Sequence, residues 1–420
     1  MLDTNILLNL NERVLKKFSA RDISCDHVKH LANIYKKIQI LKREVETEQC
    51  ERNSLVNRVA VLKQQDGVIK GDNGAIITKL GELKKSINQK QSLIVSLSED
   101  FKRQWIVIPN LPLDDEIPVG DESMNQVIRK WGKQRSFDFK PLNHWIILEK
   151  RNLVDFKRAV KLASARFVLY KNKGAKLMRA LQNFTLDINE KNGYTEILPP
   201  VLVNWKSFYG SGQFPKFEKE VFSISDSDLF LSSTGEVQLV NFFRDEILDE
   251  KQLPIAFTTS TINFRSEAGN AGKDTKGIIR LHQFYKTELV KFCKVENGVD
   301  EHEKTVLNAC EILEKLNLPY QQVLLASKDM SVSSQKTYDL EVWMPGSGKY
   351  REISSISLCG TYQSRRAMIR YNSGTVGDNR YVSTINGSSL ALDRLFAAIV
   401  ENYQTADGNF EVPSVLERYM

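Results

Sequence analysis

Residues 264–292 read FRSEAGNAGKDTKGIIRLHQFYKTELVKF, in which two alternating segments flank a loop of Gly, Asn, Asp and Lys. This pattern predicts a β-hairpin in which alternate residues share one face. The predicted common face of the two strands holds Arg265, Glu267, Arg280, His282, Phe284, Lys286, Glu288 and Val290. We interpret it as a ligand-binding patch. Strands with salt-bridged, solvent-facing side chains are the alternative that this stretch alone leaves open.

The side chains of this patch match three different chemical groups. Arginine offers a planar fork of donors to a phosphate or a carboxylate. Phe284 could stack on a base, and the Glu288 carboxylate could receive an ammonium group. The patch therefore suits a ligand with a phosphate, a purine and an amino group.

The stretch lies within a longer region, from about residue 125 to 420, in which strand and helix patterns are mixed. Strand patterns occur at 255–264, 278–292 and 336–345, and helix patterns at 176–192, 299–316 and 388–403. This mixture predicts an α+β domain built on an antiparallel sheet. Neither G-x-G-x-x-G nor G-x-x-x-x-G-K-[ST] occurs, so the sequence supports neither a Rossmann site nor a P-loop.

The first quarter of the chain has a heptad pattern. Its first apolar stripe holds Leu31, Ile34, Ile38, Leu41, Val45, Leu55, Val59 and Leu62, interrupted by Glu48 and Arg52. Its second stripe follows Gly67, Gly71 and Gly74 and holds Ile76, Leu80, Leu83, Ile87, Lys90, Ile94, Leu97 and Phe101. Two such helices predict an antiparallel coiled-coil hairpin over about 27–103. Glu48 and Arg52 could pair with each other or fix the register against the second helix.

The hairpin also concentrates the positive charge of the chain. Residues 27–104 hold 15 Lys and Arg against 9 Asp and Glu, whereas the whole chain has a net charge of +7. Such a local excess favours an anionic polymer as the partner, which makes the hairpin a nucleic-acid-binding arm. A dimerisation strut with a solvated charged face is the alternative.

Length and composition suggest several domains and no membrane span. The 420 residues suit two or three domains, which we place at 1–104, a proline-containing linker at 105–124, and 125–420. No run of 18 apolar residues and no targeting leader is apparent, so we expect a cytoplasmic protein. The five cysteines form no C-x-x-C pair, so we expect reduced thiols and no zinc.

Two more stretches complete a family pattern. NGYTEILPPVLVN (192–204) reads as a helix end, a strand and a Pro-Pro break, and NGSSLALDRLFAAIVENY (386–403) as a strand-to-helix junction with Arg394 in the early helix. With 264–292 they resemble the three signature motifs of class II aminoacyl-tRNA synthetases. FYGSGQFPKF, the STGE of 233–236, KTYDLEVW, REISS and the MLD start resemble the bacterial type of seryl-tRNA synthetase. The resemblance spans the whole chain and implies a class II antiparallel catalytic domain with a coiled-coil arm.

The resemblance implies an ATP-dependent reaction in which L-serine becomes seryl-adenylate and is then transferred to the 3′ end of tRNA(Ser). The resemblance does not decide whether tRNA(Sec) is also a substrate. Arg265 would bind the α-phosphate and Arg394 the γ-phosphate, and these two are the implied catalytic residues. The ATP site it implies comprises Arg265, Ser266, Glu267, Phe284, Glu352, Ile353, Ser354, Ser355 and Arg394. Glu352 and Ser355 would ligate Mg²⁺, which prefers oxygen ligands.

The resemblance also implies a serine site, a homodimer and a tRNA-binding arm. The residues implied for serine are Thr234, Gly235, Glu236, Arg265, Glu288 and Ser388. A pocket that hydrogen-bonds the hydroxyl of serine would discriminate strongly against alanine. The basic arm would hold tRNA(Ser) by shape and backbone.

The sequence departs from the family at a few places. Gly235 stands where alanine is usual, and Leu358 and Thr361 stand where Asn and Asp are usual. Residues 327–339 are richer in serine than is common. These departures leave one alternative, a catalytically weakened paralogue that acts as a tRNA- or protein-binding module.

Overall fold

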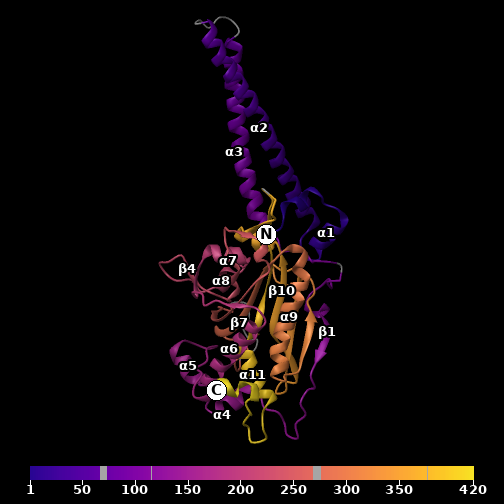
Figure 1. The fold of residues 1–420 in the computed structure, drawn as a ribbon, viewed down its shortest axis with the longest axis vertical. Coiled ribbons are helices and arrows are strands. Elements are labelled where there is room, and N and C mark those ends of the chain that lie inside the picture. Colours follow the sequence, from indigo (N-terminus) through magenta and orange to yellow (C-terminus); the bar gives the residue numbers. More distant parts are fainter. Residues whose placement is uncertain (67–72, 115, 268–275, 376) are drawn as a thin grey trace. The chain divides into compact units, whose positions relative to one another are not determined.

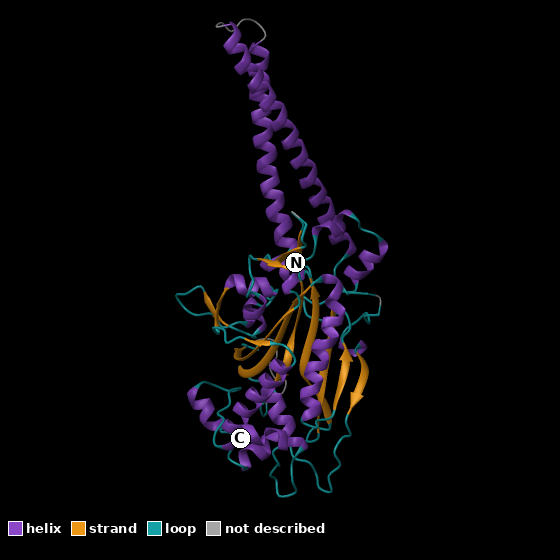
Figure 2. Cartoon of the chain, viewed as in Figure 1, coloured by secondary structure: helices purple, strands orange, loops and turns teal. Residues whose placement is uncertain are grey.

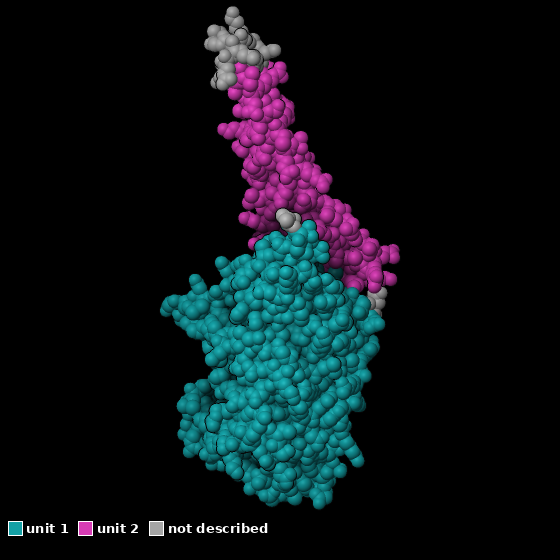
Figure 3. All heavy atoms as spheres, viewed as in Figure 1, with its two compact units in different colours: residues 1–2, 109–420 teal, residues 3–108 magenta. Residues whose placement is uncertain are grey.

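We describe the protein from a computed structural model, which covers residues 1–66, 73–114, 116–267, 276–375 and 377–420. The chain divides into two compact units (Figure 3), one formed by Asp3–Ile108 and the other by Met1–Leu2 with Pro109–Met420. Each unit is described by itself. In the described residues, no helix combines the length and the apolar character that crossing a membrane requires.

The unit of Asp3–Ile108 is a helical hairpin on a short base (Figure 1). Its elements are the 3-10 helix η1 (Thr4–Leu8), α1 (Glu12–Ser19), α2 (Cys25–Asp66) and α3 (Asn73–Trp105). At 1.5 Å per residue, the 42 residues of α2 extend about 60 Å. The predicted hairpin is confirmed, although Gly67, Gly71 and the side chain of Leu62 lie outside the described residues.

The predicted stripes form the seam of this hairpin. The buried side chains on the stripes are Leu31, Ile38, Val45, Leu83, Ile87 and Phe101. At the polar interruption, Ser86 and Lys90 of α3 donate hydrogen bonds of 3.0 and 2.9 Å to the Glu48 carboxylate. Of the two alternatives for Glu48, the structure therefore shows the contact with the second helix, a polar contact that favours one register.

The larger unit is built on a sheet, whose strands are orange in Figure 2. This sheet has eight strands in the order β1-β8-β9-β10-β13-β7-β6-β2. Its strands are β1 (Gln126–Trp131), β2 (Thr195–Glu196), β6 (Ile255–Phe264), β7 (Gln283–Cys293), β8 (Tyr320–Leu324), β9 (Lys336–Met344), β10 (Lys349–Gly360) and β13 (Ser383–Ala391). Only the edge pair β2–β6 is parallel, and the other pairs are antiparallel. The predicted antiparallel α+β architecture is confirmed.

Two small sheets and several helices complete this unit. The small sheets pair β3 (Leu202–Asn204) with β4 (Leu229–Leu231), and β5 (Ile247–Asp249) with β11 (Arg370–Asn372) and β12 (Asn379–Tyr381). The helices are α4 (His144–Lys150), α5 (Phe156–Leu162), α6 (Lys173–Lys191), α7 (Trp205–Ser211), α8 (Glu236–Val240), α9 (Gly298–Lys315), α10 (Tyr362–Ala367) and α11 (Leu392–Asn402). The 3-10 helices are η2 (Glu122–Met124), η3 (Glu218–Glu220), η4 (Glu250–Gln252), η5 (Val295–Asn297) and η6 (Ser414–Tyr419).

Alternation along β7 assigns its two faces. Thr287 bonds Thr185 of α6, with 2.8 Å between the hydroxyl oxygens, and so faces the helices that cover one side of the sheet. Val290 packs with Leu239 and Val240 of α8 on the other side. Phe284, Lys286 and Glu288 share the α8 face by parity and all line one cavity, as the sequence predicts.

The structure corrects two predicted boundaries and the placement of Arg265 and Glu267 on a strand. The 278–292 strand begins only at Gln283, and β6 ends at Phe264, so Arg265, Glu267, Arg280 and His282 lie outside the paired strands. The reason is visible at Glu267, whose φ of 50° turns the chain out of the extended conformation. The 388–403 helix begins only at Leu392, because Ser388 to Ala391 pair with β7 in the sheet.

The proline-containing segment after the hairpin lies along the larger unit. Asn110 donates hydrogen bonds of 2.8 Å to the carbonyls of Ser333 and Cys359. The Ser327 amide in turn donates to the Pro118 carbonyl at 2.7 Å. This segment is therefore tied to residues 327–335, which the sequence marked as unusual for the family.

Candidate active site

A cavity of about 490 Å³ opens over β7, β10 and β13, at the start of α11. The sequence-predicted residues that line it are Thr234, Glu236, Arg265, Glu267, Phe284, Glu288, Glu352, Ile353, Ser355, Ser388 and Arg394. These come from segments more than 150 residues apart, which the antiparallel sheet brings side by side. The cavity volume is within the usual range for a small-molecule site.

Arg265 and Phe284 lie against each other in the wall of the cavity. The Arg265 guanidinium lies 5.2 Å from the centre of the Phe284 ring, and its Nε donates to the Ser233 carbonyl at 3.3 Å. The remaining guanidinium nitrogens are thus held beside an aromatic face. An anionic group and a flat ring can be bound next to each other here.

Glu267 and Arg280 form an ion pair, with 2.5 Å between Oε2 and Nη1, and both side chains are largely buried. They lie on either side of residues 268–275, which are outside the described residues. The pair fixes the distance between the end of β6 and the segment that enters β7. Arg280 therefore has a partner in the protein.

Arg394, in the first turn of α11, is held by three contacts. Its Nε donates to the Ile279 carbonyl at 3.2 Å and its Nη1 to the Glu352 carbonyl at 2.6 Å. The Glu352 carboxylate lies 3.3 Å from the same nitrogen. The Arg394 guanidinium beside Glu352 holds the pKa of that carboxyl below its usual range.

Oxygen donors gather next to Glu352. Burial, with the neighbouring charge of Glu352, raises the pKa of Asp339, which also bonds the Ser355 hydroxyl. Among the described residues, the Asp339 Oδ1 has no hydrogen-bond partner. Within the described residues, no group of three or more His, Cys, Asp or Glu side chains could hold a metal ion alone. Glu352 and Ser355 fit a hard cation such as Mg²⁺ that takes further oxygen ligands from water and phosphate.

Acidic side chains surround the other end of the cavity. Glu288, almost fully buried, accepts a 2.7 Å hydrogen bond from the Thr234 hydroxyl and forms an ion pair with Lys286. Burial, and then the negative charge of Glu288, raises the pKa of Glu236 to about 7. Gln363 donates to Glu236 at 2.8 Å. The carboxylates of Glu236 and Glu288 thus face one small polar space, which suits a ligand ammonium.

Three predicted site residues do not line the cavity. Ser266 points outward and donates to the Lys219 carbonyl at 3.3 Å. Ser354 is buried behind the sheet and donates to the Ser388 carbonyl at 2.5 Å, because the bulge after Glu352 shifts the alternation. Gly235 lies under the pocket, where an added Cβ would come within 2.6 Å of the Thr259 methyl.

Lys286 belongs to the patch predicted by alternation, but the family resemblance gives it no role; in the structure it lines the cavity and forms an ion pair with Glu288. Sequence reasoning missed Gln363 and Asn386 altogether. Gln363 and Asn386 belong to a buried network in which the Gln363 amide oxygen accepts from Thr384 at 2.7 Å and from Asn386 at 3.2 Å. No local pattern marks this network, because its members are distant in sequence.

Two of the family departures lie away from the cavity. Leu358 is 2% exposed and packs in the main apolar core. Thr361 precedes α10, where its hydroxyl accepts from Arg365 at 3.0 Å. Ser331, Val332 and Ser333 of the serine-rich segment do line the cavity. The departure that reaches the site is therefore the 327–335 segment.

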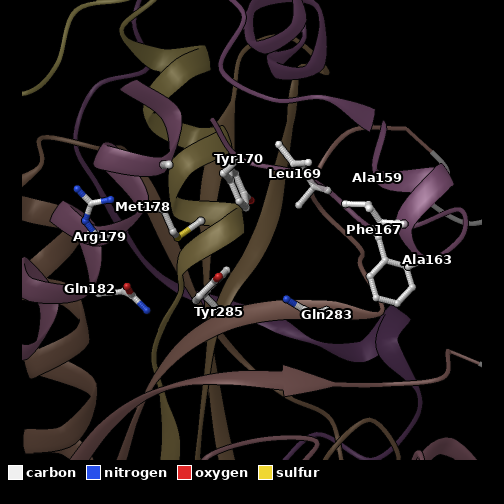
Figure 4. A pocket seen from close by; sticks show the side chains of 13 residues that line it. Ala159, Ala163, Phe167, Leu169, Tyr170, Met178, Arg179, Gln182, Gln283 and Tyr285 are labelled. Carbon is white, nitrogen blue, oxygen red and sulfur yellow. The ribbon is translucent and has the colours of Figure 1, made fainter. Parts of the chain in front are cut away.

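A second cavity, also of about 490 Å³, lies on the other side of β7, where Gln283 and Tyr285 face α5 and α6 (Figure 4). The Tyr170 hydroxyl in its wall donates to the Asp393 carboxylate, which also accepts from the Tyr285 amide at 2.6 Å. Burial raises the pKa of Asp393 to about 7. The contacts of Asp393 fix the first turn of α11 and hence the backbone of Arg394.

The chain matches two family models, the Seryl-tRNA synthetase N-terminal domain at 1–112 and the tRNA synthetase class II core domain (G, H, P, S and T) at 217–403. It is 44% identical over 428 residues to the serine--tRNA ligase of Malacoplasma penetrans, covering 100% of this chain and 98% of that protein. It is equally 44% identical over 420 residues to the serine--tRNA ligase of Mycoplasmoides gallisepticum, with the same coverage.

Solved structures are similar over the full length as well. The seryl-tRNA synthetase of Pyrococcus horikoshii, crystallised with ATP, superposes with a TM-score of 0.94 at 32% identity, covering 100% of this chain and 98% of that one. The cytoplasmic serine-tRNA ligase of Naegleria fowleri, in complex with AMP, superposes with a TM-score of 0.87 at 24% identity, covering 100% of this chain and 97% of that one. The second comparison supports the fold.

Proposed function

The chain belongs to the seryl-tRNA synthetase family of class II aminoacyl-tRNA synthetases, and we propose that its cavity activates L-serine with ATP and transfers it to the 3′ end of tRNA(Ser). One observation supports this most directly. The cavity has a guanidinium beside an aromatic ring at one end, and the buried Glu288 carboxylate beside the half-buried Glu236 at the other. That arrangement is complementary to a nucleotide phosphate and purine on one side and an amino acid ammonium on the other.

At the nucleotide end, Phe284 stacks on the adenine and Glu267 contacts its edge. Arg265 binds the α-phosphate and Arg394 the γ-phosphate. Arg394 suits this role because three protein contacts already hold it, so little ordering is left for substrate binding. The remaining nucleotide contacts are assigned to Ile353 and Ser355.

At the amino acid end, Glu288 receives the ammonium, and Thr234 orients Glu288 through its 2.7 Å hydrogen bond. Glu236 and Ser388 complete the polar pocket. Serine presents its carboxylate, already a nucleophile, toward the α-phosphate, so no strong protein base is required. The protein contributes positioning and stabilisation of negative charge, mainly through Arg265.

Magnesium is the metal ion whose preferences fit this site. Glu352 and Ser355 would hold Mg²⁺, which supplies positive charge to the phosphates when bound. Glu352 suits this role because Arg394 keeps it ionised and because its side chain is about half exposed, at 49%. The half-buried Asp339 bonds the Ser355 hydroxyl and thereby orients it.

The helical hairpin is assigned as the tRNA-binding arm, and the protein as a homodimer of the cytoplasm. Lysines on the exposed side of α2 and α3 would contact the tRNA backbone. The edge strand β2 and the exposed Leu198 and Trp205, at 87% and 41%, offer an apolar surface near motif 1 for the second subunit. No observation favours the weakened paralogue, since Leu358 and Thr361 lie off the cavity.

Serine-dependent exchange of pyrophosphate into ATP tests the first step, and charging of tRNA(Ser) transcripts tests the second. We expect exchange with serine, and much less with alanine or threonine, because a pocket built to hydrogen-bond the hydroxyl disfavours alanine and a serine enzyme must refuse the larger threonine by size. Absence of serine-dependent exchange, or equal exchange with alanine, would contradict the proposed function.

A further inference from the structure

His144 is a buried histidine outside the cavity whose two ring nitrogens have different partners. At the start of α4 it is 1% exposed, and its Nδ1 lies 2.7 Å from Oε1 of Glu401, near the end of α11. The His144 amide donates to the same oxygen at 2.9 Å, and the Gly346 amide donates to the other carboxylate oxygen at 2.8 Å. Both oxygens of the Glu401 carboxylate thus accept hydrogen bonds from the protein.

The other ring nitrogen binds the backbone of the motif 2 segment. The Ile278 amide donates to Nε2 of His144 at 3.2 Å. An amide can only donate, so Nε2 carries no proton, and the proton of the neutral ring lies on Nδ1, pointing at Glu401. Glu401 therefore fixes the tautomer in which His144 can accept from Ile278.

The backbone is fitted closely to this ring. Gly277 has a φ of +80°, and a Cβ added there would lie 2.1 Å from Nε2 of His144. Glycine is required at this position both by the left-handed conformation and by the approach of the ring. The close approach of the Gly277 backbone to the His144 ring therefore indicates that the ring positions this segment.

The bound segment connects directly to the nucleotide end of the cavity. Ile278, Ile279 and Arg280 line the cavity, and the Ile279 carbonyl accepts from Nε of Arg394 at 3.2 Å. Residues 277–282 belong to no strand, so no ladder of hydrogen bonds positions them. His144 holds them at Ile278 and the Glu267 ion pair holds them at Arg280. At His282 the amide donates to the Arg166 carbonyl at 2.9 Å, and the carbonyl accepts from the Arg265 amide at 3.0 Å.

We propose that His144, held by Glu401, is a positioning residue for ATP: it fixes the Ile278–Ile279 backbone and thereby the Arg394 guanidinium. This inference rests on the proposed function, in which Arg394 binds the nucleotide. His144 does not line the cavity. Its effect should be confined to the nucleotide, because Thr234, Glu236 and Glu288 have no contact with the Ile278 segment among their hydrogen bonds.

Two variants separate the two ring nitrogens. In His144→Asn the amide can still donate to Glu401, but the shorter side chain cannot reach the Ile278 amide. In His144→Gln the amide oxygen of the longer side chain can accept from the Ile278 amide, but the hydrogen bond to Glu401 is weakened. ATP binding is measured by calorimetry on the full chain without serine, and the KM values for ATP and serine by pyrophosphate exchange.

We expect His144→Asn to weaken ATP binding about fivefold or more, the effect of one lost hydrogen bond, with the KM for serine within about twofold of wild type. The ATP affinity of His144→Gln should lie between those of wild type and His144→Asn. The inference is overturned if both folded variants bind ATP like wild type, or if the serine and ATP KM values rise together. Calorimetry measures ATP binding in the absence of serine. Failure of this inference, seen as normal ATP binding by both variants, can therefore be distinguished from failure of the proposed function, seen as a wild-type protein without serine-dependent exchange.

Discussion

The Thr234 hydroxyl donates a 2.7 Å hydrogen bond to the buried carboxylate of Glu288, so that a loop before α8 and a central strand of the sheet jointly orient one acidic group. Lys286, two residues before Glu288 on the same face, forms an ion pair with it. The Glu288 carboxylate is thus held in place before any ligand arrives, and it is the natural point at which to test amino acid binding.

Replacing Glu288 with Gln should raise the KM for serine strongly and the KM for ATP much less. The substitution keeps the shape and the acceptor for Thr234 but removes the charge that faces the ammonium. Pyrophosphate exchange at varied serine and varied ATP measures both values. Thr234→Val, which removes only the orienting hydroxyl, is the matched control and should have a smaller effect in the same direction. Equal rises for both substrates would contradict the assignment.

Replacing Arg265 with Ala should remove at least ~3 kcal/mol of transition-state stabilisation, a loss of about a hundredfold in exchange rate. The guanidinium is the charged group beside Phe284 that is assigned to the reacting phosphate. Arg265→Lys, which keeps the charge but not the planar fork, should lie between Ala and wild type. Exchange within tenfold of wild type in the Ala variant, with an unchanged melting temperature, would rule out this role.

Serine binding should weaken as the pH falls below about 7. Burial raises the pKa of Glu236 to about 7, so the carboxyl is increasingly neutral below that pH, whereas a bound ammonium favours its ionised form. The KM for serine should therefore rise from pH 8 to pH 6. Glu236→Gln should flatten this dependence, and a variant that retains the full pH slope would show that another group is responsible.

The stability of the catalytic unit should fall as the pH drops from about 6.5 to about 4 because of His302. Burial lowers the pKa of His302 to about 4, and its Nε2 donates to the Ile356 carbonyl at 2.9 Å. Between these pH values the unfolded chain binds a proton that the folded protein does not, which disfavours folding by up to ~3 kcal/mol. Urea unfolding at pH 7 and pH 5 measures this change.

His302→Gln provides the control for that experiment, because the amide can still donate to Ile356 but does not titrate. The difference in unfolding free energy between wild type and this variant should shrink or reverse at pH 5. A difference that is the same at both pH values would mean that His302 does not contribute to the acid sensitivity.

The arm should matter for tRNA and not for adenylate formation. Lys36, Lys42, Lys84 and Lys85 are exposed on α2 and α3. Their joint replacement by Glu should reduce tRNA charging, lower the salt dependence of tRNA binding and leave pyrophosphate exchange unchanged, because phosphate contacts release counterions. Deleting about residues 30–100, with a short Gly linker, should abolish efficient charging in the same way. Loss of exchange with persistent tRNA binding would support the strut interpretation instead.

Local patterns predicted much of this protein. The heptad spacing identified the hairpin, because a buried stripe at that spacing requires two packed helices. Alternation placed Phe284, Lys286 and Glu288 on one face, since side chains of a strand alternate. These rules act over a few residues and are therefore readable without a structure. They place boundaries less well, as the late starts of β7 and α11 show.

Only the tertiary structure decided which distant groups meet. The heptad pattern could not choose between Arg52 and the second helix as the partner of Glu48, because both were within reach until the helices were paired. A bulge in β10 removed Ser354 from the cavity, and a core position took Leu358 away from it. The anchoring of Arg394 by Ile279 and of Ile278 by His144 joins residues more than 100 positions apart. Such contacts depend on how the sheet and helices pack, and no periodicity in the chain encodes them.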